Sequence, residues 1–313
     1  MQRILVVYYS QTGQLGSIAR TLVEPLEAAE DCRVTCRALD PETPYPFPWP
    51  FFDFLDVFPE TVLLDPPPIR DPGLDAEARF DLVILAYTVW FLSPAPPITA
   101  FLKSDAGRRV LRDTPVITVV GCRNMWLQAQ EVIKGLLREA GAKHCDHVAL
   151  TDRGSSIKTL FTTPRWMLTG RREPFWGIFP RAGIAEQDIR DSARFGESIL
   201  EALRAGRLDG RAPVLRGLGA AAVDDRLIDS ERIGKRSFLI WGRLIRAVGP
   251  PGHPIRRAVL GAYVLFLIAM IATVVPVTMS LRVLLRPLRR SKIAREREYY
   301  EQPSGADRSR LQA

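Results

Sequence analysis

The stretch that decides the fold lies at the start of the chain, which reads Ile4-Leu5-Val6-Val7-Tyr8-Tyr9 and then Ser10-Gln11-Thr12-Gly13-Gln14-Leu15. The first six residues form an apolar run, rich in β-branched and aromatic side chains, of the kind that a parallel sheet buries on both faces. A helix is expected next, because apolar residues recur at helical spacing, at Leu15, Ile18, Leu22 and Leu26. The polar residues between them are therefore predicted to form a tight strand-to-helix turn.

The same alternation continues along the chain. Further short strands are expected at residues 32–39, 81–87, 115–121 and 147–151, and helices at 97–110, 127–140 and 185–204. Short apolar strands that alternate with helices of ten or more residues are typical of a parallel sheet with helices on both faces. The predicted fold class is therefore α/β, with a doubly wound, five-stranded parallel sheet.

The turn after the first strand has the chemistry of a phosphate site. Backbone amides at the start of a helix supply donors at short range, and Ser10 and Thr12 add hydroxyl groups. Gly13 lets the backbone approach a ligand closely. Ligands of such sheets bind outside the carboxyl ends of the strands, where this turn lies. The alternative is an ordinary polar turn without a ligand.

This motif resembles the phosphate loop of flavodoxins, whose pattern is Ser or Thr, any residue, Thr, Gly, any residue, then Thr or Asn. The present chain departs at the last position, where Leu15 removes a hydroxyl group. The resemblance implies a flavodoxin-like fold and flavin mononucleotide (FMN) as the cofactor. The departure at Leu15 implies weaker flavin binding.

Two more loops fall where flavodoxins hold the isoalloxazine ring, one at 88–94 and one at 121–126. Each contains a tryptophan, so Trp90 or Trp126 is a candidate to stack on the flavin, while loop amides, Asn124 or Arg123 would stabilise negative charge on the reduced ring. The alternative is that both tryptophans only pack against the end of the sheet. The predicted cofactor-binding residues are Ser10, Gln11, Thr12, Gly13, Gln14, Leu15, Thr88, Val89, Trp90, Phe91, Leu92, Gly121, Cys122, Arg123, Asn124 and Trp126.

No catalytic group is evident from the sequence. His144 and His147 are placed before and near the start of the fifth strand, at the end opposite the flavin, and His253 lies far along the chain. The better placed candidates for proton transfer are Tyr87, Arg123 and Asp152, each near the carboxyl end of a strand. The four cysteines fit no metal-binding pattern and are interpreted as reduced thiols, so no metal is predicted.

The chain divides into a core domain and a C-terminal extension. Residues 1–205 are predicted to form the flavodoxin-like domain, with ordered insertions rich in aromatic residues at 40–78 and 153–184. A linker at 206–234 and an amphipathic juxtamembrane segment at 235–257 follow. Residues 258–281 are a predicted transmembrane or re-entrant helix, and residues 282–313 a basic, disordered tail.

The extension carries a membrane signal. Residues 258–281 contain no charged side chain, and at about 1.5 Å per residue they are long enough to span a hydrocarbon core of about 30 Å. The net charge of +8 is concentrated around this segment, which indicates contact with anionic lipid, and no nucleic-acid motif is present. We expect attachment to the inner (cytoplasmic) membrane with the flavodoxin domain in the cytoplasm. A single crossing is favoured over a re-entrant form bent at Pro276.

The chain as a whole resembles a bacterial group of flavodoxin-like proteins named for dialkylresorcinol biosynthesis. The resemblance rests on the opening motif 8–14, on Trp90-Phe91-Leu92-Ser93-Pro94, on Gly121-Cys122-Arg123-Asn124-Met125-Trp126 and on Gly249-Pro250-Pro251-Gly252. It implies a flavin-dependent oxidoreductase, an aromatase that oxidises a lipophilic dialkylcyclohexanedione to a dialkylresorcinol. It also implies a ketosynthase of the same pathway as a partner.

Two other functions remain open at this stage. One is a membrane-associated quinone or flavin reductase that takes hydride from NAD(P)H. The other is a non-catalytic flavodoxin-like docking module of a biosynthetic complex, which Leu15 and the lack of an obvious base would favour.

Overall fold

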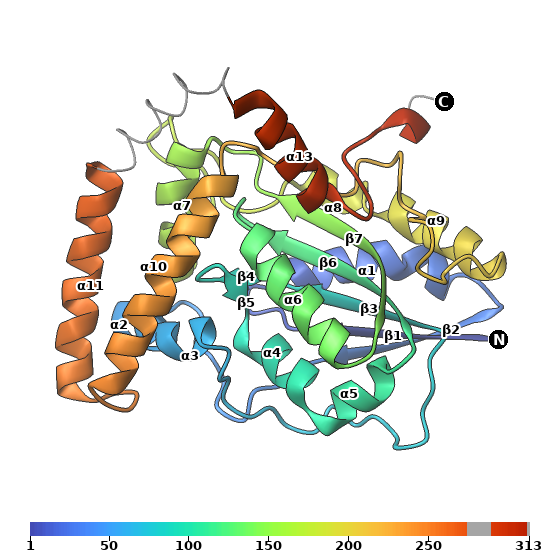
Figure 1. Ribbon diagram of the computed structural model, residues 1–313, viewed down its shortest axis with the longest axis horizontal. Helices are drawn as coiled ribbons and strands as arrows, with labels where there is room; N and C mark the ends of the chain where they lie inside the picture. Colours follow the sequence, from blue (N-terminus) through green and yellow to red (C-terminus); the bar gives the residue numbers. More distant parts are fainter. Residues whose placement is uncertain (274–288, 312–313) are drawn as a thin grey trace.

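A computed structural model describes residues 1–273 and 289–311. Its centre is a five-stranded parallel sheet with the strand order β2-β1-β3-β6-β7 (Figure 1). The strands are β1 (Gln2–Tyr8), β2 (Cys32–Ala38), β3 (Leu82–Tyr87), β6 (Pro115–Cys122) and β7 (Lys143–Thr151). This is the doubly wound order of flavodoxin-like sheets, so the predicted fold class is confirmed.

The sheet is buried because helices cover both of its faces. Along β1, Leu5 and Val7 pack into one core, and Ile4 and Val6 into the other, since neighbouring side chains of a strand point to opposite faces. The first core lies under α4 (Pro96–Lys103), α5 (Asp105–Leu111) and α6 (Leu127–Glu139). The second lies under α1 (Gln14–Glu27), α8 (Glu186–Arg190) and α9 (Ala193–Arg204).

Strand β1 is the point at which the strand order of the sheet reverses: the chain adds β2 on one side of β1 and the later strands on the other. It pairs with β2 on one side and with β3 on the other, in parallel register, as at Val6 with Cys36 and with Ile84. The connections after β1 and β3 leave on opposite faces, which opens a crevice at their carboxyl ends. The turn that the sequence singles out as a phosphate site follows β1 directly and lies at this crevice.

Both insertions contain helices, and they meet each other. The first contains α2 (Phe51–Asp56) and α3 (Phe58–Val62), and the second contains α7 (Ser156–Thr169). The backbone N–H of Trp49 donates to the carbonyl of Met167 over 2.8 Å, which joins the two insertions. A two-strand hairpin, β4 (Val89–Trp90) with β5 (Ser93–Pro94), lies beside them.

The stretch after α9 is packed, which differs from the flexible linker predicted at 206–234. Leu215, Ala220 and Ala221 are fully buried, and the N–H of Ala149 in β7 donates to the carbonyl of Ala220 over 2.7 Å. Strand β7 is an edge strand, so its free backbone groups need a partner that this stretch supplies. The linker prediction is therefore wrong for these residues.

Two antiparallel helices form a hairpin beside the first insertion. They are α10 (Ile228–Ala247), which begins seven residues before the predicted juxtamembrane segment at 235, and α11 (Pro254–Ala272). In the described ranges, α11 is the helix whose length and composition suffice for a membrane span, with a mean hydropathy of 1.9. Residues 274–281 of the predicted membrane segment, with Pro276, lie outside the described residues.

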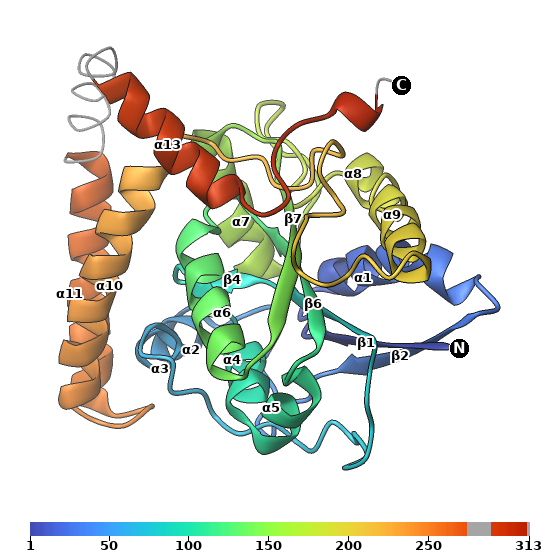
Figure 2. The same ribbon diagram turned by 45° about the vertical axis from the view of Figure 1, so that its right-hand side comes forward.

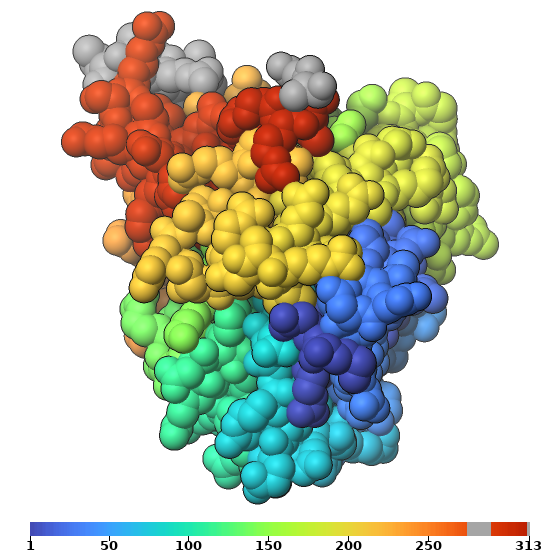
Figure 3. All heavy atoms as spheres, turned by 90° about the vertical axis from the view of Figure 1, so that its right-hand side faces the viewer, coloured from blue at the N-terminus to red at the C-terminus, as the bar shows by residue number. Residues whose placement is uncertain are grey.

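The C-terminal residues fold back onto the core. Helix α13 (Arg290–Glu301) and the 3-10 turn η2 (Ser309–Leu311) replace the disordered tail that the sequence predicted at 282–313, so that prediction is wrong for 290–311. Figure 3 shows these red residues lying across the gold stretch that follows α9. Tyr300 and Ser304 are buried. The hydroxyl of Ser304 donates to Asp146 and accepts from the N–H of His147, both over 2.7 Å.

This attachment gives a stability prediction. Ser304→Ala leaves a buried N–H and a buried carboxylate oxygen without their partner, and each unsatisfied group costs about 1–3 kcal/mol. We expect the free energy of unfolding, measured in urea, to fall by about 1–3 kcal/mol for each of the two groups. Ser309→Ala, at a hydroxyl that bonds only to exposed Asp307, is the control and should change it by about 0.5 kcal/mol or less. Equal effects of the two changes would contradict a packed C-terminus.

Candidate functional site

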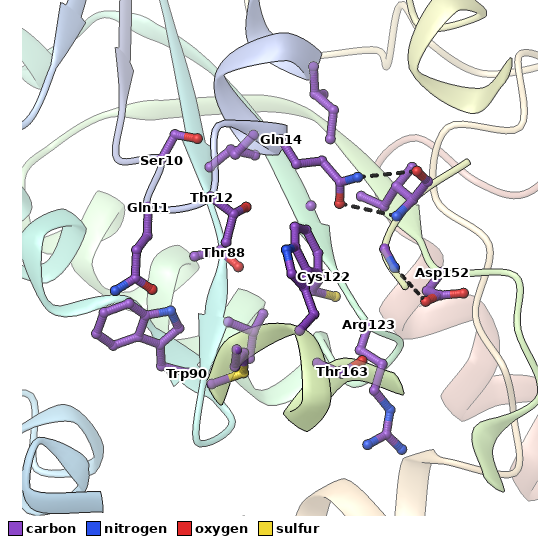
Figure 4. Close-up of a pocket in the computed structure, with 18 of the residues that line it drawn as sticks. Ser10, Gln11, Thr12, Gln14, Thr88, Trp90, Cys122, Arg123, Asp152 and Thr163 are labelled. Carbon is purple, nitrogen blue, oxygen red and sulfur yellow. Dashed lines mark hydrogen bonds between the residues drawn. The ribbon is translucent and has the colours of Figure 1, made fainter. Parts of the chain in front are cut away.

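A cavity of about 150 Å³ opens at the carboxyl ends of β1, β3 and β6 (Figure 4). In Figure 4, Ser10, Thr12 and Thr88 lie on one side of it, and Asp152 and Arg123 lie across from them. The loops after all three strands contribute to its wall, as expected for a ligand site of an open α/β sheet. The predicted residues that line it are Ser10, Gln11, Thr12, Gln14, Leu15, Thr88, Val89, Trp90, Gly121, Cys122 and Arg123.

The turn after β1 has the geometry of an anion site. Gly13 is the N-cap of α1 and has a φ of 82°, a left-handed conformation that glycine adopts without strain. The Ser10 hydroxyl oxygen accepts from the N–H of Gly16 over 3.0 Å, which leaves its own O–H free to donate. Thr12 lines the cavity beside it. The turn therefore directs two hydroxyl groups and the N-terminus of a helix at one place.

The last two residues of the motif do not serve as free donors. The side-chain amide of Gln14 accepts from the N–H of Ile184 over 3.1 Å and donates to the carbonyl of the same residue over 3.2 Å. Leu15 is buried, and its methyl carbon lies 3.1 Å from the position that a Cβ on Gly121 would occupy. An apolar contact thus stands where flavodoxins have a hydroxyl group, and Gln14 fixes the second insertion.

Trp90 forms part of an aromatic wall. Its ring centroid lies 6.1 Å from that of Tyr9, 5.1 Å from Tyr45 and 5.6 Å from Trp49, the last two from the first insertion. The indole N–H of Trp49 donates to the side chain of Gln11 over 2.9 Å, and Gln11 donates to the carbonyl of Pro46 over 2.8 Å. The first insertion is therefore hydrogen-bonded to the phosphate-loop turn itself.

Phe91 and Leu92 form the tight turn between β4 and β5 and point away from the cavity. Both have a positive φ, 49° and 57°, which is unfavourable for a residue with a Cβ by roughly 1–2 kcal/mol. The ring of Phe91 packs on Phe54 at 4.8 Å and on Phe58 at 5.1 Å. The structure therefore places these two predicted cofactor contacts outside the cavity lining, in a strained hairpin that presents Trp90.

In the loop after β6, too, some of the predicted residues line the cavity and others do not. Arg123 lines the cavity, and burial lowers the pKa of its guanidinium. Trp126, the other predicted stacking residue, is buried against the ring of His147 at 4.8 Å and does not line the cavity, because α6 begins directly after it. Arg123 Nε and Asn124 Oδ1 are buried with no hydrogen-bond partner in the described part of the chain. A ligand at this loop would supply the missing partners.

The three candidates for proton transfer lie in different places. Tyr87 is fully buried outside the cavity, where its hydroxyl donates to Gln130 over 2.6 Å and burial raises its pKa well above the usual range. Asp152 lines the cavity but accepts from the N–H groups of Gly154 at 2.8 Å and Gly183 at 3.0 Å. Its carboxylate thus fastens the second insertion, and Arg123 is the other candidate that lines the cavity.

The second insertion supplies a wall that the site prediction from sequence did not include. Trp166 and Met167 come from α7, and Gly183 and Ile184 from the segment that Gln14 and Asp152 hold. The signal in the sequence was the density of aromatic residues in 153–184, which predicted an ordered cover but not which side chains face inward. The lining residues that were missed are Tyr9, Ile18, Thr163, Trp166, Met167, Gly183 and Ile184.

Helix α10 holds the loops that follow β3 and β6 in place. The ammonium group of Lys235 donates to the carbonyl of Leu92 at 3.3 Å and to the Ser93 hydroxyl at 2.5 Å. One turn earlier, the carboxylate of Glu231 accepts from the N–H of Gln128 at 3.0 Å, at the start of α6. Burial raises the pKa of Glu231 to about 8 and lowers that of Lys235 to about 8. The loops after β3 and β6 thus depend on a helix more than 90 residues away along the chain.

Comparisons with known proteins add little to this assignment. No protein-family model matches the sequence, and no curated protein matches it. Among solved structures, a flavoprotein in complex with FMN from Lactobacillus acidophilus has 16% identity over 48% of this chain and 93% of its own, with a TM-score of 0.38. A WrbA-like flavodoxin from Agrobacterium tumefaciens has 13% identity over 66% and 99%, with a TM-score of 0.37. At such scores, the fold assignment rests on the strand order itself.

Glu231 gives a prediction for the pH dependence of stability. Burial raises its pKa to about 8 in the folded chain, whereas the ordinary value of 4.5 applies in the unfolded chain, so the folded state binds more protons between these values. The contribution of Glu231 to the free energy of unfolding should therefore fall as the pH rises from 4.5 to 8, whereas His144 and His147, whose pKa values burial lowers, contribute in the opposite direction below about pH 6.5. Glu231→Gln keeps an oxygen for the N–H of Gln128 and removes the charge, so the fall between pH 6 and 8 should become flatter.

The measurement is urea unfolding at several pH values. Asp146, whose pKa burial raises to about 6, contributes in the same direction but mainly below pH 6, and Lys235 contributes mainly above pH 8. Exposed Glu298, changed to Gln, is the matched control. A wild-type slope that Glu231→Gln leaves unchanged between pH 6 and 8 would show that this carboxyl group is not buried as described.

Proposed function

We propose that the chain binds FMN at the cavity between β1 and β3 and acts as a membrane-associated, flavin-dependent oxidoreductase. The observation that carries this proposal is the turn after β1, where left-handed Gly13 opens α1 and the Ser10 and Thr12 hydroxyl groups face one end of the cavity. A phosphate monoester needs such donors at short range. In flavodoxin-like sheets of this strand order, the β1/β3 switch point is the place where FMN binds.

The ring side of the cavity is consistent with a flavin. Trp90, Trp166 and Met167 give it an apolar wall, and Arg123 supplies a positive charge at the opposite side. The unpaired buried atoms Arg123 Nε and Asn124 Oδ1 indicate that the loop after β6 is completed by a polar group from outside the chain. When bound, FMN supplies hydride and single-electron transfer, and the protein supplies binding, orientation and the exclusion of water.

The phosphate site gives a binding prediction. Thr12→Val removes a donor, and a hydrogen bond to a charged group contributes about 1.5–3 kcal/mol, so FMN affinity should fall roughly tenfold or more. Gly13→Val should weaken it as well, because valine is strained at a φ of 82° although no atom lies within 4 Å of its Cβ position. Fluorescence titration of apoprotein with FMN measures both.

Thr35→Val, in β2 and away from the cavity, is the matched control and should leave the affinity unchanged. If both variants at the turn bind FMN as the unchanged protein does, the turn is not the phosphate site. Preserved unfolding midpoints in urea would separate a lost contact from a lost fold.

We also propose that the substrate is lipophilic, and specifically a dialkylcyclohexanedione, as the resemblance to dialkylresorcinol-forming flavoproteins implies. Conversion of this ring to a resorcinol removes one hydride and one proton, and the product is aromatic. The apolar insertions that wall the cavity and the exposed apolar face of α11 support a substrate that partitions into lipid. Arg123 is placed to stabilise negative charge that develops at the cavity.

The reaction is tested by mixing the flavin-loaded protein with a dialkylcyclohexanedione without oxygen. We expect the visible absorption of the oxidised flavin to bleach in proportion to the resorcinol formed, because the flavin accepts the hydride. Arg123→Gln should slow this bleaching while flavin remains bound. Bleaching by NADPH but not by the dione would instead support a quinone or flavin reductase, and a protein that takes up no FMN would support the docking module.

A further inference from the structure

The α10–α11 hairpin presents an apolar face to solvent. Figure 2 shows the two helices side by side at the edge of the molecule, and both pack against the first insertion. On α11, Leu265 is 71% exposed and Ile268 is 58% exposed, and on α10, Ile240 is 66% exposed. Large apolar side chains that gather on one exposed face mark a binding surface. The exposed large apolar residues of the two helices, which we call the outer face, are Ile233, Ile240, Leu244, Ile255, Leu265, Phe266, Ile268 and Ile271, and the ring of Phe266 also packs on Trp241 at 5.2 Å.

The inner face of α11 is fixed to the water-soluble domain. The side chain of Arg256 is fully buried between the carboxylates of Asp56 and Glu60, with N–O distances of 2.6 Å to each. Two turns further on, the ring of Tyr263 stacks on Phe58 with centroids 4.8 Å apart and planes at 15°. A helix that crosses a bilayer needs lipid or other membrane helices around it, whereas α11 lies against α2, α3 and α10.

The chain then returns to the same domain. Helix α13 is ion-paired to α10 through Glu296 with Arg232 at 3.1 Å, and Arg289, the N-cap residue of α13, pairs with Asp229 of α10 at 3.0 Å. After it, Ser304 bonds to Asp146, and the carbonyl of Gly305 accepts from the N–H of Ala221. The segments before α11 and from Arg289 onward are therefore held by one body.

If α11 crossed the bilayer, the chain would need a second crossing to return to the domain. The number of residues between α11 and Arg289 is too small for that crossing. Residues 274–288 are 15 in number, and 15 residues at about 1.5 Å each reach about 22 Å as a helix, short of the roughly 30 Å of a hydrocarbon core. Extended backbone would reach farther but would leave its polar groups unsatisfied in lipid. A chain that crosses once cannot place its C-terminal residues on the domain that precedes the crossing.

The charge around the outer face fits an anionic surface. Arg236 and Arg243 follow the same helical spacing as Ile233, Ile240 and Leu244 on α10, and both are exposed, as is Arg257 at the start of α11. Within residues 1–273 and 289–311, none of these three arginines has an ion-pair partner. Arginine interleaved with large apolar residues is the pattern of a helix that lies in the membrane interface.

We propose that the outer face of the α10–α11 hairpin lies on one leaflet of an anionic lipid bilayer, without crossing it, so that residues before and after the hairpin stay on the same side. This inference rests on the membrane association in the proposed function and replaces the single crossing favoured by the sequence. Because α10 also braces Leu92, Ser93 and the start of α6, lipid contact occurs on the helix that shapes the cavity loops.

The first test measures binding of the full chain to vesicles of two parts phosphatidylcholine and one part phosphatidylglycerol by co-sedimentation. Leu265→Asp with Ile268→Asp should weaken binding at least tenfold, because two apolar contacts are lost and two charges added. Arg236→Glu and Arg243→Glu should each weaken it roughly fivefold, and only when phosphatidylglycerol is present. Leu311→Asp, at an exposed apolar residue of η2 on the other side of the molecule, is the control.

Two results would overturn the proposal at this stage. One is vesicle binding that none of the hairpin changes weakens although urea unfolding shows the variants to be folded. The other is a dimer in the absence of lipid that Leu265→Asp dissociates, with no binding to vesicles, which would assign the face to a second copy of the chain. Neither measurement uses flavin, so failure of the flavin assignment would leave this test intact.

The second test locates the two ends of the chain in cells. Green fluorescent protein fused before Met1 and, in a second strain, after Ala313 should fluoresce in both, and alkaline phosphatase at either position should be inactive. Alkaline phosphatase active after Ala313 but inactive before Met1 would prove a single crossing and overturn the proposal. Release of the unchanged protein from membranes by mild salt alone would contradict the proposed apolar contact between the hairpin and the bilayer.

Discussion

The parallel sheet brings the carboxyl ends of all its strands to one edge, and the rest of the molecule depends on how that edge is completed. The polar backbone groups at this edge must be covered, while the crevice where a ligand binds stays accessible. The turn after β1 supplies free donors, the two insertions build walls over it, and their backbones meet at Trp49 and Met167. The cavity is therefore a product of segments that lie far apart in sequence.

The helical hairpin extends the same construction. Lys235 and Glu231 reach the loops after β3 and β6 from α10, and the hydrophobic cluster of Phe58, Ile245, Leu260 and Tyr263 joins α10 and α11 to the first insertion. The strained turn at Phe91 and Leu92 persists because these neighbours hold it. An oxidoreductase with a lipophilic substrate would gain from this arrangement, since the helix proposed to contact lipid also braces the loops of the cavity.

The sequence predicted those parts of the structure that depend on local pattern. Apolar runs and helical spacing identified the sheet, and the polar residues after the first strand identified a turn in which the structure places Gly13 in a left-handed conformation. Long-range packing was not predictable in this way. Trp126 turns inward because α6 begins there and His147 lies beside it, and Ser304 is ordered by Asp146, 158 residues earlier in the chain. The polar composition of residues 282–313 predicted a disordered tail, because no local pattern reveals the partners that the polar side chains of residues 289–310 have in the structure.

The central claim is that the turn after β1 binds the phosphate of FMN, and the most direct test compares FMN with riboflavin, which has the same ring and no phosphate. Isothermal titration of apoprotein with both should give an affinity for FMN at least about a hundredfold higher, as expected for two or more charge-assisted hydrogen bonds. Equal affinities, or no binding of either compound, would contradict the claim.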